Sequence, residues 1–511
     1  MAVDVGTEGI RTGIFDLKGN NLAISKVKCA ISFLKEGWIE QDPYKLWEAL
    51  KKSILCCLNT SHINSSYIGG ISVDSTSVTL IAVDNKGNPL RPAILWMDTR
   101  AYKEAEMINH TNHPVLKFVG GKISPEWMIP KMLWLKNNEL DLYKKAYKIV
   151  GVMDWLVYKL TGQWTASLCN VSCEWNYVSS LGGWQKDFLE TVGLKDVFAK
   201  LPDKIYPMGS VISELKPKVA EEIGLSPHAL VIESGIDGYA AALGVNVFKP
   251  GRVSYVLGSS SGYITLSSTP KFSSGIWGPV PDAIVPGQWV IEGGQTSAGS
   301  IIRWFRENFF YKNMEELREK ERNLYSQLDK GAEKISPGSE GLIVLDYWQG
   351  NRIPFGDSLA RGAVVGLSLN HTYFHIYRAI LEGIVYGGYH ILNIFNNMGL
   401  KVNEICASGG GSKSRLWMQI HADVFNIPII LPKQPDTSLL GDAICVATGE
   451  EIYGSLQEAA NNMVQIGNVI EPKFANHKIY KEYFQKYLKI YPKLQGLMHE
   501  LARGTLRYEI N

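Results

Sequence analysis

The sequence predicts an α/β protein composed of two related domains. Strand-like runs that end in Gly/Asn turns alternate with helical patterns along all 511 residues, which is typical of α/β architectures. Residues 256–262 also echo residues 4–9: each segment is a strand that ends in glycine and is followed by small or hydroxyl residues. The echo favours a duplication, with chance as the alternative. The Pro-Gly pair at 250–251 places the boundary, so that the predicted domains span residues 1–248 and 249–511.

The individual elements follow from local signals. Residues 10–15 and 79–84 each run into a Gly/Asn turn, so each is expected to be one strand of a β-hairpin. Asp42 and Pro43 form a helix start ahead of an apolar stripe, and that helix is expected to pack on a sheet. The most apolar long segment, residues 379–395, is shorter than the roughly 20 residues that a membrane span needs. We therefore expect a buried core helix there and no membrane partner.

Composition and charge narrow the classes of function. With 45% hydrophobic, 20% charged and 11% aromatic residues, the chain can bury large cores, which excludes a single small binding module and wholesale disorder. The 52 Lys and Arg residues against 50 Asp and Glu leave a net charge of +2, so no strong field favours nucleic acid or an acidic membrane. Any ligand must therefore be recognised locally, which favours a small molecule.

The cysteines and the N-terminal segment indicate a cytoplasmic protein. The seven cysteines are odd in number, scattered and too sparse for a disulfide scaffold. Cys169 and Cys173 have no second Cys or His pair at zinc-like spacing, so they are interpreted as buried apolar residues rather than metal ligands. No basic or apolar stretch of signal-peptide length precedes the strand pattern at residues 2–6, so we expect no export.

Common nucleotide signatures are absent, but small turns after strands are frequent. The glycine-rich run at residues 408–414 has Ser412 where a Walker A loop has glycine, and no G-x-G-x-x-G follows the first strand. Glycine lets the backbone approach a phosphate closely, and nearby N–H and hydroxyl groups then donate to the phosphate oxygens. Two such turns that face each other can bind a triphosphate between them. Taken singly, each turn can also be an ordinary turn without a ligand. The candidate turns contain Gly6, Thr7, Gly258, Ser259, Ser260, Gly299, Gly409, Gly410 and Gly411.

Several acidic and amide side chains are candidates for the chemistry itself. Asp237 is flanked by small residues ahead of an Ala/Leu/Gly helix pattern. A carboxylate there is either a helix N-cap or, facing a phosphate clamp, a general base that accepts a hydroxyl proton. Polar clusters also occur at residues 74–77, 96–100 and 292–295. Such loops supply the aromatic faces and planar polar groups of sugar sites, and loops with solvated salt bridges are the alternative.

These motifs, in this order, resemble the FGGY carbohydrate kinases, a family of the sugar kinase, Hsp70 and actin superfamily, over nearly the whole chain. Asp4-x-Gly6-Thr7 with Arg11 matches the first phosphate motif of the family. Family signatures and segments are further matched at residues 131–138, 350–354, 362–382, 408–415 and 440–443. The resemblance implies an α/β fold of two ribonuclease-H-like domains around a central cleft.

The resemblance also implies roles for individual residues, with ATP and Mg²⁺ as cofactors. Asp237 is expected to be the catalytic base, and Asp4 and Asp237 to hold Mg²⁺. The ATP side is expected to contain Gly6, Thr7, Arg11, Gly258, Ser259, Ser260, Gly299, Gly409, Gly410 and Arg415. The sugar side is expected to contain Asp74, Ser75, Thr76, Arg100, Glu174, Asp237, Glu292 and Gln295.

Within the family, residues 96–101, 119–131 and 175–177 look most like the ribulokinase and ribitol kinase branch. The implied activity is ATP-dependent phosphorylation of a primary hydroxyl of a ketopentose or pentitol. Glu174 stands where that branch usually has a lysine. A carboxylate accepts hydrogen bonds where an ammonium group donates them, so the preferred substrate can differ. L-ribulose, xylulose, erythritol and glycerol therefore stay open as alternative substrates. A non-kinase ATPase of the superfamily and a sugar-sensing pseudokinase are further alternatives. Family members are often dimers, so a homodimer is one expected assembly.

Overall fold

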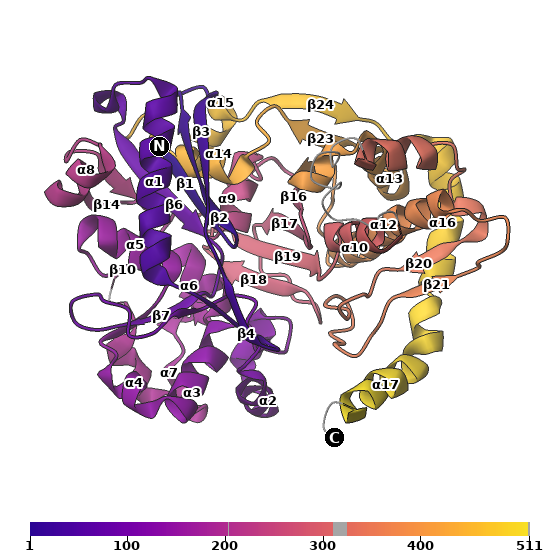
Figure 1. Cartoon of the computed structure of the whole chain (residues 1–511), viewed down its shortest axis with the longest axis horizontal. Helices are drawn as coiled ribbons and strands as arrows, with labels where there is room; N and C mark the ends of the chain where they lie inside the picture. The colour runs from indigo at the N-terminus through magenta and orange to yellow at the C-terminus, as the bar shows by residue number, and fades with distance from the viewer. Residues whose placement is uncertain (203, 310–323, 509–511) are drawn as a thin grey trace.

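The protein consists of two α/β lobes, each with a central mixed sheet (Figure 1). The structure is a computed structural model that describes residues 1–202, 204–309 and 324–508. In spatial order, the first sheet contains β14 (Val211–Glu214), β15 (Leu230–Ile232), β6 (Gly70–Ser75), β1 (Ala2–Gly6), β2 (Gly9–Phe15) and β3 (Asn21–Lys28). The second contains β18 (Trp277–Pro281), β19 (Trp289–Gln295), β17 (Ser261–Ser267), β16 (Arg252–Leu257), β22 (Glu404–Ser408), β23 (Ile429–Pro432) and β24 (Ile466–Ile470).

Six strands of each sheet have the same pairing order. In the first sheet β1, β2 and β3 form an antiparallel run, and β1 pairs parallel with β6, which pairs parallel with β15. In the second sheet β16, β17 and β19 repeat the antiparallel run, and β16 pairs parallel with β22, which pairs parallel with β23. The β1–β2 turn therefore corresponds to the β16–β17 turn. The predicted α/β fold and its duplication are confirmed, and the boundary after residue 248 stays a prediction.

A third sheet and an outer helical layer extend the first lobe, at the lower left of Figure 1. The sheet contains β4 (Ser32–Lys35), β5 (Trp38–Gln41), β8 (Ala93–Ile94), β7 (Leu80–Val83) and β9 (Lys148–Gly151). The helices are α2 (Tyr102–His110), α3 (Met128–Asn138), α4 (Leu140–Lys145), α6 (Leu168–Glu174) and α7 (Lys186–Thr191). Leu80 and Ile94 of the sheet share one hydrophobic core with Ile108 and Met132 of the helices.

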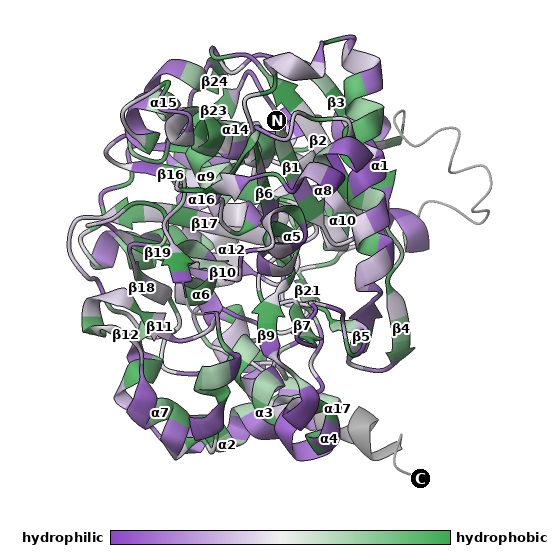
Figure 2. Ribbon diagram, turned by 90° about the vertical axis from the view of Figure 1, so that its left-hand side faces the viewer, coloured by the Kyte–Doolittle hydropathy of each residue, from purple (hydrophilic) through white to green (hydrophobic). Residues whose placement is uncertain are grey.

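The remaining helices surround the two central sheets. In the first lobe they are α1 (Pro43–Ser61), α5 (Val152–Thr161), α8 (Pro217–Ile223) and α9 (Asp237–Gly244). From the second half of the chain come α10 (Gly299–Phe309), α12 (Tyr373–Asn397), α13 (Arg415–Phe425), α14 (Thr437–Gly449), α15 (Leu456–Met463), α16 (Phe474–Tyr487) and α17 (Ile490–Tyr508). Short strand pairs are β10 (Thr165–Ser167) with β13 (Lys204–Tyr206), β11 (Tyr177–Val178) with β12 (Gly183–Trp184), and β20 (Ile343–Leu345) with β21 (Ala363–Val365). Figure 2 shows hydrophobic residues along central strands such as β6 and hydrophilic residues on outer helices such as α4.

Local sequence signals account for several of these elements. β2 and β3 form the expected hairpin, and β7 pairs antiparallel with β8 after its Gly/Asn turn. Asp42 caps α1 and accepts from the N–H of Tyr44 at 2.9 Å, and α1 packs on β2 and β3. Residues 379–395 lie within α12 and are mostly buried, as predicted for a core helix. Among the described residues, no helix combines the length and the apolar character that a membrane crossing requires.

Helices α9 and α14 cross in close backbone contact between the lobes. A Cβ added to Gly441 of α14 would lie 1.9 Å from the carbonyl oxygen of Ala240, and one added to Gly244 of α9 would lie 1.9 Å from that of Thr437. Only glycine at these two positions lets the helices approach so closely. The chain continues from α14 into α15, and both helices lie beside the first sheet rather than the second (Figure 1). The starts of α9 and α14, at Asp237 and Thr437, are thereby fixed relative to β1 and β6.

Candidate active site

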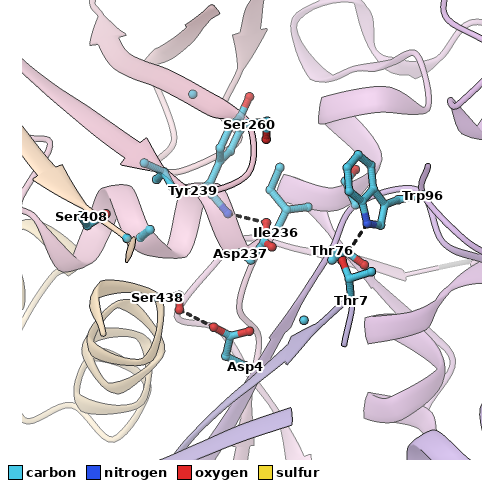
Figure 3. Close-up of a pocket in the computed structure, with 18 of the residues that line it drawn as sticks. Asp4, Thr7, Thr76, Trp96, Ile236, Asp237, Tyr239, Ser260, Ser408 and Ser438 are labelled. Atoms are coloured by element: carbon cyan, nitrogen blue, oxygen red, sulfur yellow. Dashed lines mark hydrogen bonds between the residues drawn. The ribbon is translucent and has the colours of Figure 1, made fainter. Parts of the chain in front are cut away.

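A cavity of about 480 Å³ lies between the lobes. Its walls come from the β1–β2 turn, the loop after β6, the starts of α9 and α14, the β16–β17 turn and the end of β22 (Figure 3). Because the β1–β2 and β16–β17 turns are equivalent parts of the duplicated sheets, the duplication brings two glycine turns to one space. The lining residues include Asp4, Gly6, Thr7, Arg11, Thr76, Ser77, Val78, Trp96, Glu174, Asp237, Tyr239, Gly258, Ser260, Glu292, Arg352, Gly409 and Ser438.

Asp237 is the first residue of α9 and lies on the cavity wall (Figure 3). The N-cap position is held by Ile236, so the interpretation of Asp237 as a simple N-cap is wrong. The carboxylate accepts from the N–H of Gly238 at 2.7 Å. Burial and, to a smaller extent, the negative charge of Asp4 raise the pKa of Asp237 to about 7. A carboxylate whose pKa is close to neutral pH is suited to accept a proton from a hydroxyl.

Asp4 lies on β1 and is held by side chains from both halves of the chain. Its carboxylate accepts from Arg11 and, at 2.5 Å, from the hydroxyl of Ser438 on α14. Arg11 also donates to Asp436 at 2.6 Å, just before α14. Because α14 packs on β1, this charged network forms only when the second half of the chain is in place. Neither Ser438 nor Asp436 carries a local sequence signal for this role.

The glycine turns supply the donors that a polyphosphate requires. Gly6 and Thr7 line the cavity from the first lobe, and Gly258 and Ser260 line it from the second. Gly409, after β22, has φ of 89°, and a Cβ there would lie 2.6 Å from the carbonyl oxygen of Leu257. Glycine therefore keeps the end of β22 against β16. Backbone N–H groups and hydroxyls in such turns bind phosphate oxygens.

The other end of the cavity is lined by aromatic and acidic side chains. The indole Nε1 of Trp96 donates to the hydroxyl of Thr7 at 2.9 Å, which fixes the 95–96 loop against the first glycine turn (Figure 3). The hydroxyl of Tyr239 donates to Glu292 at 3.0 Å. Glu174, at the end of α6, faces the same space.

The two glutamates at this end hold their protons more tightly than exposed carboxyls do. Burial raises the pKa of Glu292 to about 7, and the charge of Glu174 contributes to that rise. Burial also raises the pKa of Glu174 above its ordinary value. Carboxylates and aromatic faces around a polar space are suited to a polyhydroxyl ligand, whose hydroxyls donate to the carboxylates.

Comparison with known proteins decides the family. The N-terminal domain of the FGGY family of carbohydrate kinases matches residues 1–244, and the C-terminal domain of that family matches residues 253–449. The chain belongs to the FGGY family of carbohydrate kinases. It is similar to a ribulokinase of Anoxybacillus flavithermus, at 32% identity over 96% of this chain and 93% of the relative. It is also similar to an FGGY carbohydrate kinase domain-containing protein of Xenopus laevis, at 30% identity over 96% of both chains.

A solved structure supports the fold of this FGGY kinase. The crystal structure of xylulose kinase from Rhodospirillum rubrum matches it with a TM-score of 0.86 at 24% identity, covering 97% of this chain and 99% of the other. The predicted family, its resemblance to ribulokinase, the two-lobed fold and the sugar kinase class are thus confirmed. Sugar kinases of the FGGY family use ATP. The different sugars named for the relatives leave the acceptor of this FGGY kinase to be proposed.

The predicted sugar-side residues of this FGGY kinase divide into two groups. Thr76, Glu174, Asp237 and Glu292 line the cavity. Asp74 and Ser75 belong to the buried strand β6 and do not: Asp74 is paired in register with Asp4 on β1, and the Ser75 hydroxyl donates to the carbonyl of Thr76 at 3.0 Å. Burial raises the pKa of Asp74 well above its ordinary value.

Arg100 and Gln295 are corrections to the predicted sugar side, because both side chains are held in the protein interior. The guanidinium of Arg100 is fully buried, pairs with Asp98 at 2.7 Å and Glu40 at 2.9 Å, and lies over the ring of Trp38. The amide of Gln295 donates to Asp346 at 2.7 Å and accepts from Ser261 at 2.8 Å. These bonds satisfy both groups, so we assign them to the packing of the walls rather than to ligand binding.

On the ATP side, five predicted residues besides Gly409 line the cavity, namely Gly6, Thr7, Arg11, Gly258 and Ser260. Ser259 belongs to the second glycine turn but is exposed and does not line the cavity. Gly299 does not line it either, and its N–H donates to the carbonyl of Gly258 at 3.0 Å. Gly410 follows the lining residue Gly409 and does not line the cavity. Arg415 does not line this cavity: it lines a separate depression of about 360 Å³ with Gln419 and Lys473, and its role in ATP binding stays a prediction. Arg415 and Gln419 are one helical turn apart on α13, so they share its outer face.

Lys131 is a buried residue whose role is visible only in the structure. Its ammonium group on α3 donates to the carbonyls of Val78 at 2.9 Å, Leu95 at 2.7 Å and Trp96 at 3.3 Å. These carbonyls belong to two loops that line the cavity at its aromatic and acidic end. Val78 has φ of 43°, which is rare for a β-branched residue, so this loop depends on contacts that hold it in place.

We expect Lys131→Met to destabilise the protein by about 1–3 kcal/mol, because buried carbonyls lose their donors. Urea unfolding measures the loss, and the KM for sugar is expected to rise because the loops around Thr76 and Trp96 loosen. Lys136→Met on the same helix is the matched control, since Lys136 makes a partly exposed ion pair with Asp196, worth about 0–1 kcal/mol. Equal unfolding curves for the two variants would contradict the role of Lys131.

Proposed function

We propose that this FGGY kinase transfers the γ-phosphoryl group of ATP to a primary hydroxyl of a ketopentose or pentitol, with Asp237 as general base. One observation carries the proposal: Asp237, with its pKa near neutral, shares one cavity with two glycine turns and with the acidic sugar end. Phosphoryl transfer requires mainly alignment and charge stabilisation from a protein. The similarity to a ribulokinase over 96% of the chain favours a five-carbon acceptor.

In the proposed reaction, each group of side chains has one task. Gly6, Thr7 and Ser260 hold the phosphates through backbone N–H groups and hydroxyls. Gly258, whose N–H donates to the carbonyl of Ser260, leaves room for the phosphates to approach the second turn. Thr76, Trp96, Glu174 and Glu292 orient the acceptor so that its primary hydroxyl faces Asp237. Asp237 accepts the hydroxyl proton as the new oxygen–phosphorus bond forms.

The residues at the phosphate end also fit a bound Mg²⁺. Mg²⁺ is usually held in proteins by one or two carboxylates together with substrate phosphates and water. Asp4 and Asp237 are the two carboxylates that fit this pattern, and each lies on the lining of the same cavity. When bound, Mg²⁺ offsets the negative charge of the phosphates. Arg11, paired with Asp4, keeps that carboxylate oriented toward the phosphate end.

We expect Asp4→Asn to raise the Mg²⁺ concentration needed for half-maximal turnover by roughly 10- to 100-fold, because a carboxylate that orients the metal is lost. Titration of Mg²⁺ at fixed ATP measures the shift, and excess EDTA is expected to abolish turnover. Asp16→Asn, in the exposed β2–β3 turn, is the control and is expected to leave the Mg²⁺ requirement unchanged. An unaltered Mg²⁺ requirement in Asp4→Asn would refute the assignment.

A coupled ADP-release assay with ATP and Mg²⁺ tests the proposed function. The acceptor panel contains D- and L-ribulose, D-xylulose, ribitol, erythritol and glycerol, each with the wild type and with Asp237→Asn. We expect turnover with one ketopentose or pentitol and its loss in the variant. Turnover with erythritol or glycerol alone would move the proposal to a shorter acceptor. ATP binding without turnover on any acceptor would overturn it and favour an ATPase or a sugar sensor. The cytoplasmic location and the homodimer stay predictions.

A further inference from the structure

We propose that Glu174 and Glu292 act as a carboxylate pair that restricts the acceptor to an uncharged polyhydroxyl compound, and that Glu174 is the specificity-determining residue against acidic sugars. The inference rests on the proposed function, because it concerns the acceptor of the same reaction. Three observations support it: the position of the two carboxylates, the cations around them and the aromatic side chains that close this end of the cavity.

The two carboxylates stand together at the end of the cavity. Both line the main cavity with Asp237, and both line an adjoining cavity of about 10 Å³. The other walls of this small cavity include Phe118, Trp127 and Trp277. A space of that size holds about one water molecule. The acceptor chain therefore ends beside Glu174 and Glu292, where polar space gives way to aromatic side chains.

The nearby cations compensate the two glutamates only in part. Arg352 lines the same cavity, but its guanidinium also lies 3.5 Å from Glu126 and 4.6 Å from the ring centre of Trp277, so Glu126, outside the cavity, shares its charge. The ammonium of Lys131 is directed to backbone carbonyls behind the loops. Glu292 accepts a hydrogen bond from the neutral hydroxyl of Tyr239. Two carboxylates beside one shared guanidinium leave net negative charge at this end of the cavity once both are ionised; burial raises the pKa of both, that of Glu292 to about 7.

This negative charge determines which group the acceptor can carry at the end away from the phosphorylated hydroxyl. An ionised carboxylate has acceptor sites only, so it is complemented by hydroxyl donors. A terminal hydroxymethyl group supplies such a donor. A terminal carboxylate instead places a like charge against two partly desolvated carboxylates, which is strongly unfavourable. Aldonates are therefore excluded while alditols and ketoses of the same length are accepted.

The test compares ribitol with D-ribonate, which differ at one terminal carbon. For the wild type we expect kcat/KM to be on the order of 10²-fold higher for ribitol, because like-charge contacts are costly. Glu174→Gln is expected to lower this ratio about tenfold, since it removes one of the two charges. Glu174→Lys is expected to favour ribonate. Glu190→Gln, whose carboxylate is 58% exposed in a surface pair with Lys195, is the matched control and keeps the wild-type ratio.

Two kinds of failure can be distinguished. Equal kcat/KM for ribitol and ribonate in the wild type, or an unchanged ratio in Glu174→Gln, overturns the inference and leaves the kinase reaction in place. Lack of turnover with every acceptor is a failure of the proposed function. Calorimetric titration of Asp237→Asn with the two compounds then tests the inference without turnover. Tighter binding of ribitol supports it, and equal or absent binding of both overturns it.

Discussion

Asp237→Asn is expected to lower kcat by roughly 10²- to 10⁴-fold, the contribution of a positioned general base. The amide keeps the shape of the side chain but cannot accept the hydroxyl proton at neutral pH. Thermal unfolding is expected to give an equal or higher Tm, because the wild-type carboxylate is buried at an energetic cost that the amide avoids. Steady-state kinetics with a pentulose or pentitol, together with the melting curve, checks both expectations. A kcat within tenfold of the wild type would exclude Asp237 as the base.

The pH profile of the wild type gives an independent check on Asp237. Its carboxyl acts as a base only when deprotonated, and its pKa is raised to about 7. Activity is therefore expected to fall as the pH drops below about 7 and to level off above it, whereas an ordinary aspartate would keep activity down to about pH 4. The Asp237→Asn variant loses this inflection if its residual turnover does not use the base.

Gly441→Ala is expected to cause the second large effect, on both stability and catalysis. The added methyl group would lie 1.9 Å from the carbonyl oxygen of Ala240, so α14 and α9 must separate. Overpacking of this kind costs about 1–3 kcal/mol and sometimes more. Because Asp237 starts α9, the separation also displaces the base, and a displacement of ~1 Å can lower turnover about 10²-fold. Urea unfolding and kcat measure the two effects.

Gly496→Ala is the matched control for this helix crossing. Gly496 lies within α17, and a Cβ there would meet no heavy atom within 4 Å. Alanine has the higher helix propensity, so this variant is expected to be stabilised by about 0.5–1 kcal/mol with unchanged kcat. If Gly441→Ala behaves like Gly496→Ala, the close crossing does not position Asp237.

The sequence is informative where a role depends on neighbouring residues. Gly6 and Gly258 each follow a strand and precede a second strand, so the equivalent turns and the duplicated fold could be predicted from local patterns. Asp237 could be selected because small residues and an apolar helix pattern surround it. These features need no knowledge of distant contacts. Their convergence on one cavity agrees with the expected phosphate clamp.

The remaining site residues depend on contacts between distant parts of the chain. Ser438 donates to Asp4, which is 434 residues away, only because α14 packs on β1. Arg100 has the same local sequence whether it faces a sugar or, as here, the buried carboxylates of Asp98 and Glu40. Lys131 looks like an ordinary helical lysine until the loops at Val78 and Trp96 are placed beside it. Local polarity therefore cannot separate a ligand contact from a satisfied interior pair.

The return of α14 and α15 to the first sheet has a consequence for biosynthesis. Leu439 and Ile444 of α14, with Met463 of α15, share a hydrophobic core with Ala2 and Ile232. The first strand of the sheet is thus synthesised well before α14 and α15, and it waits for them before this core is closed. Contacts between such distant residues form slowly, and the apolar surface left open in the meantime is prone to aggregate. The first lobe is therefore expected to mature only after α14 and α15 have left the ribosome, with chaperones protecting its open core until then.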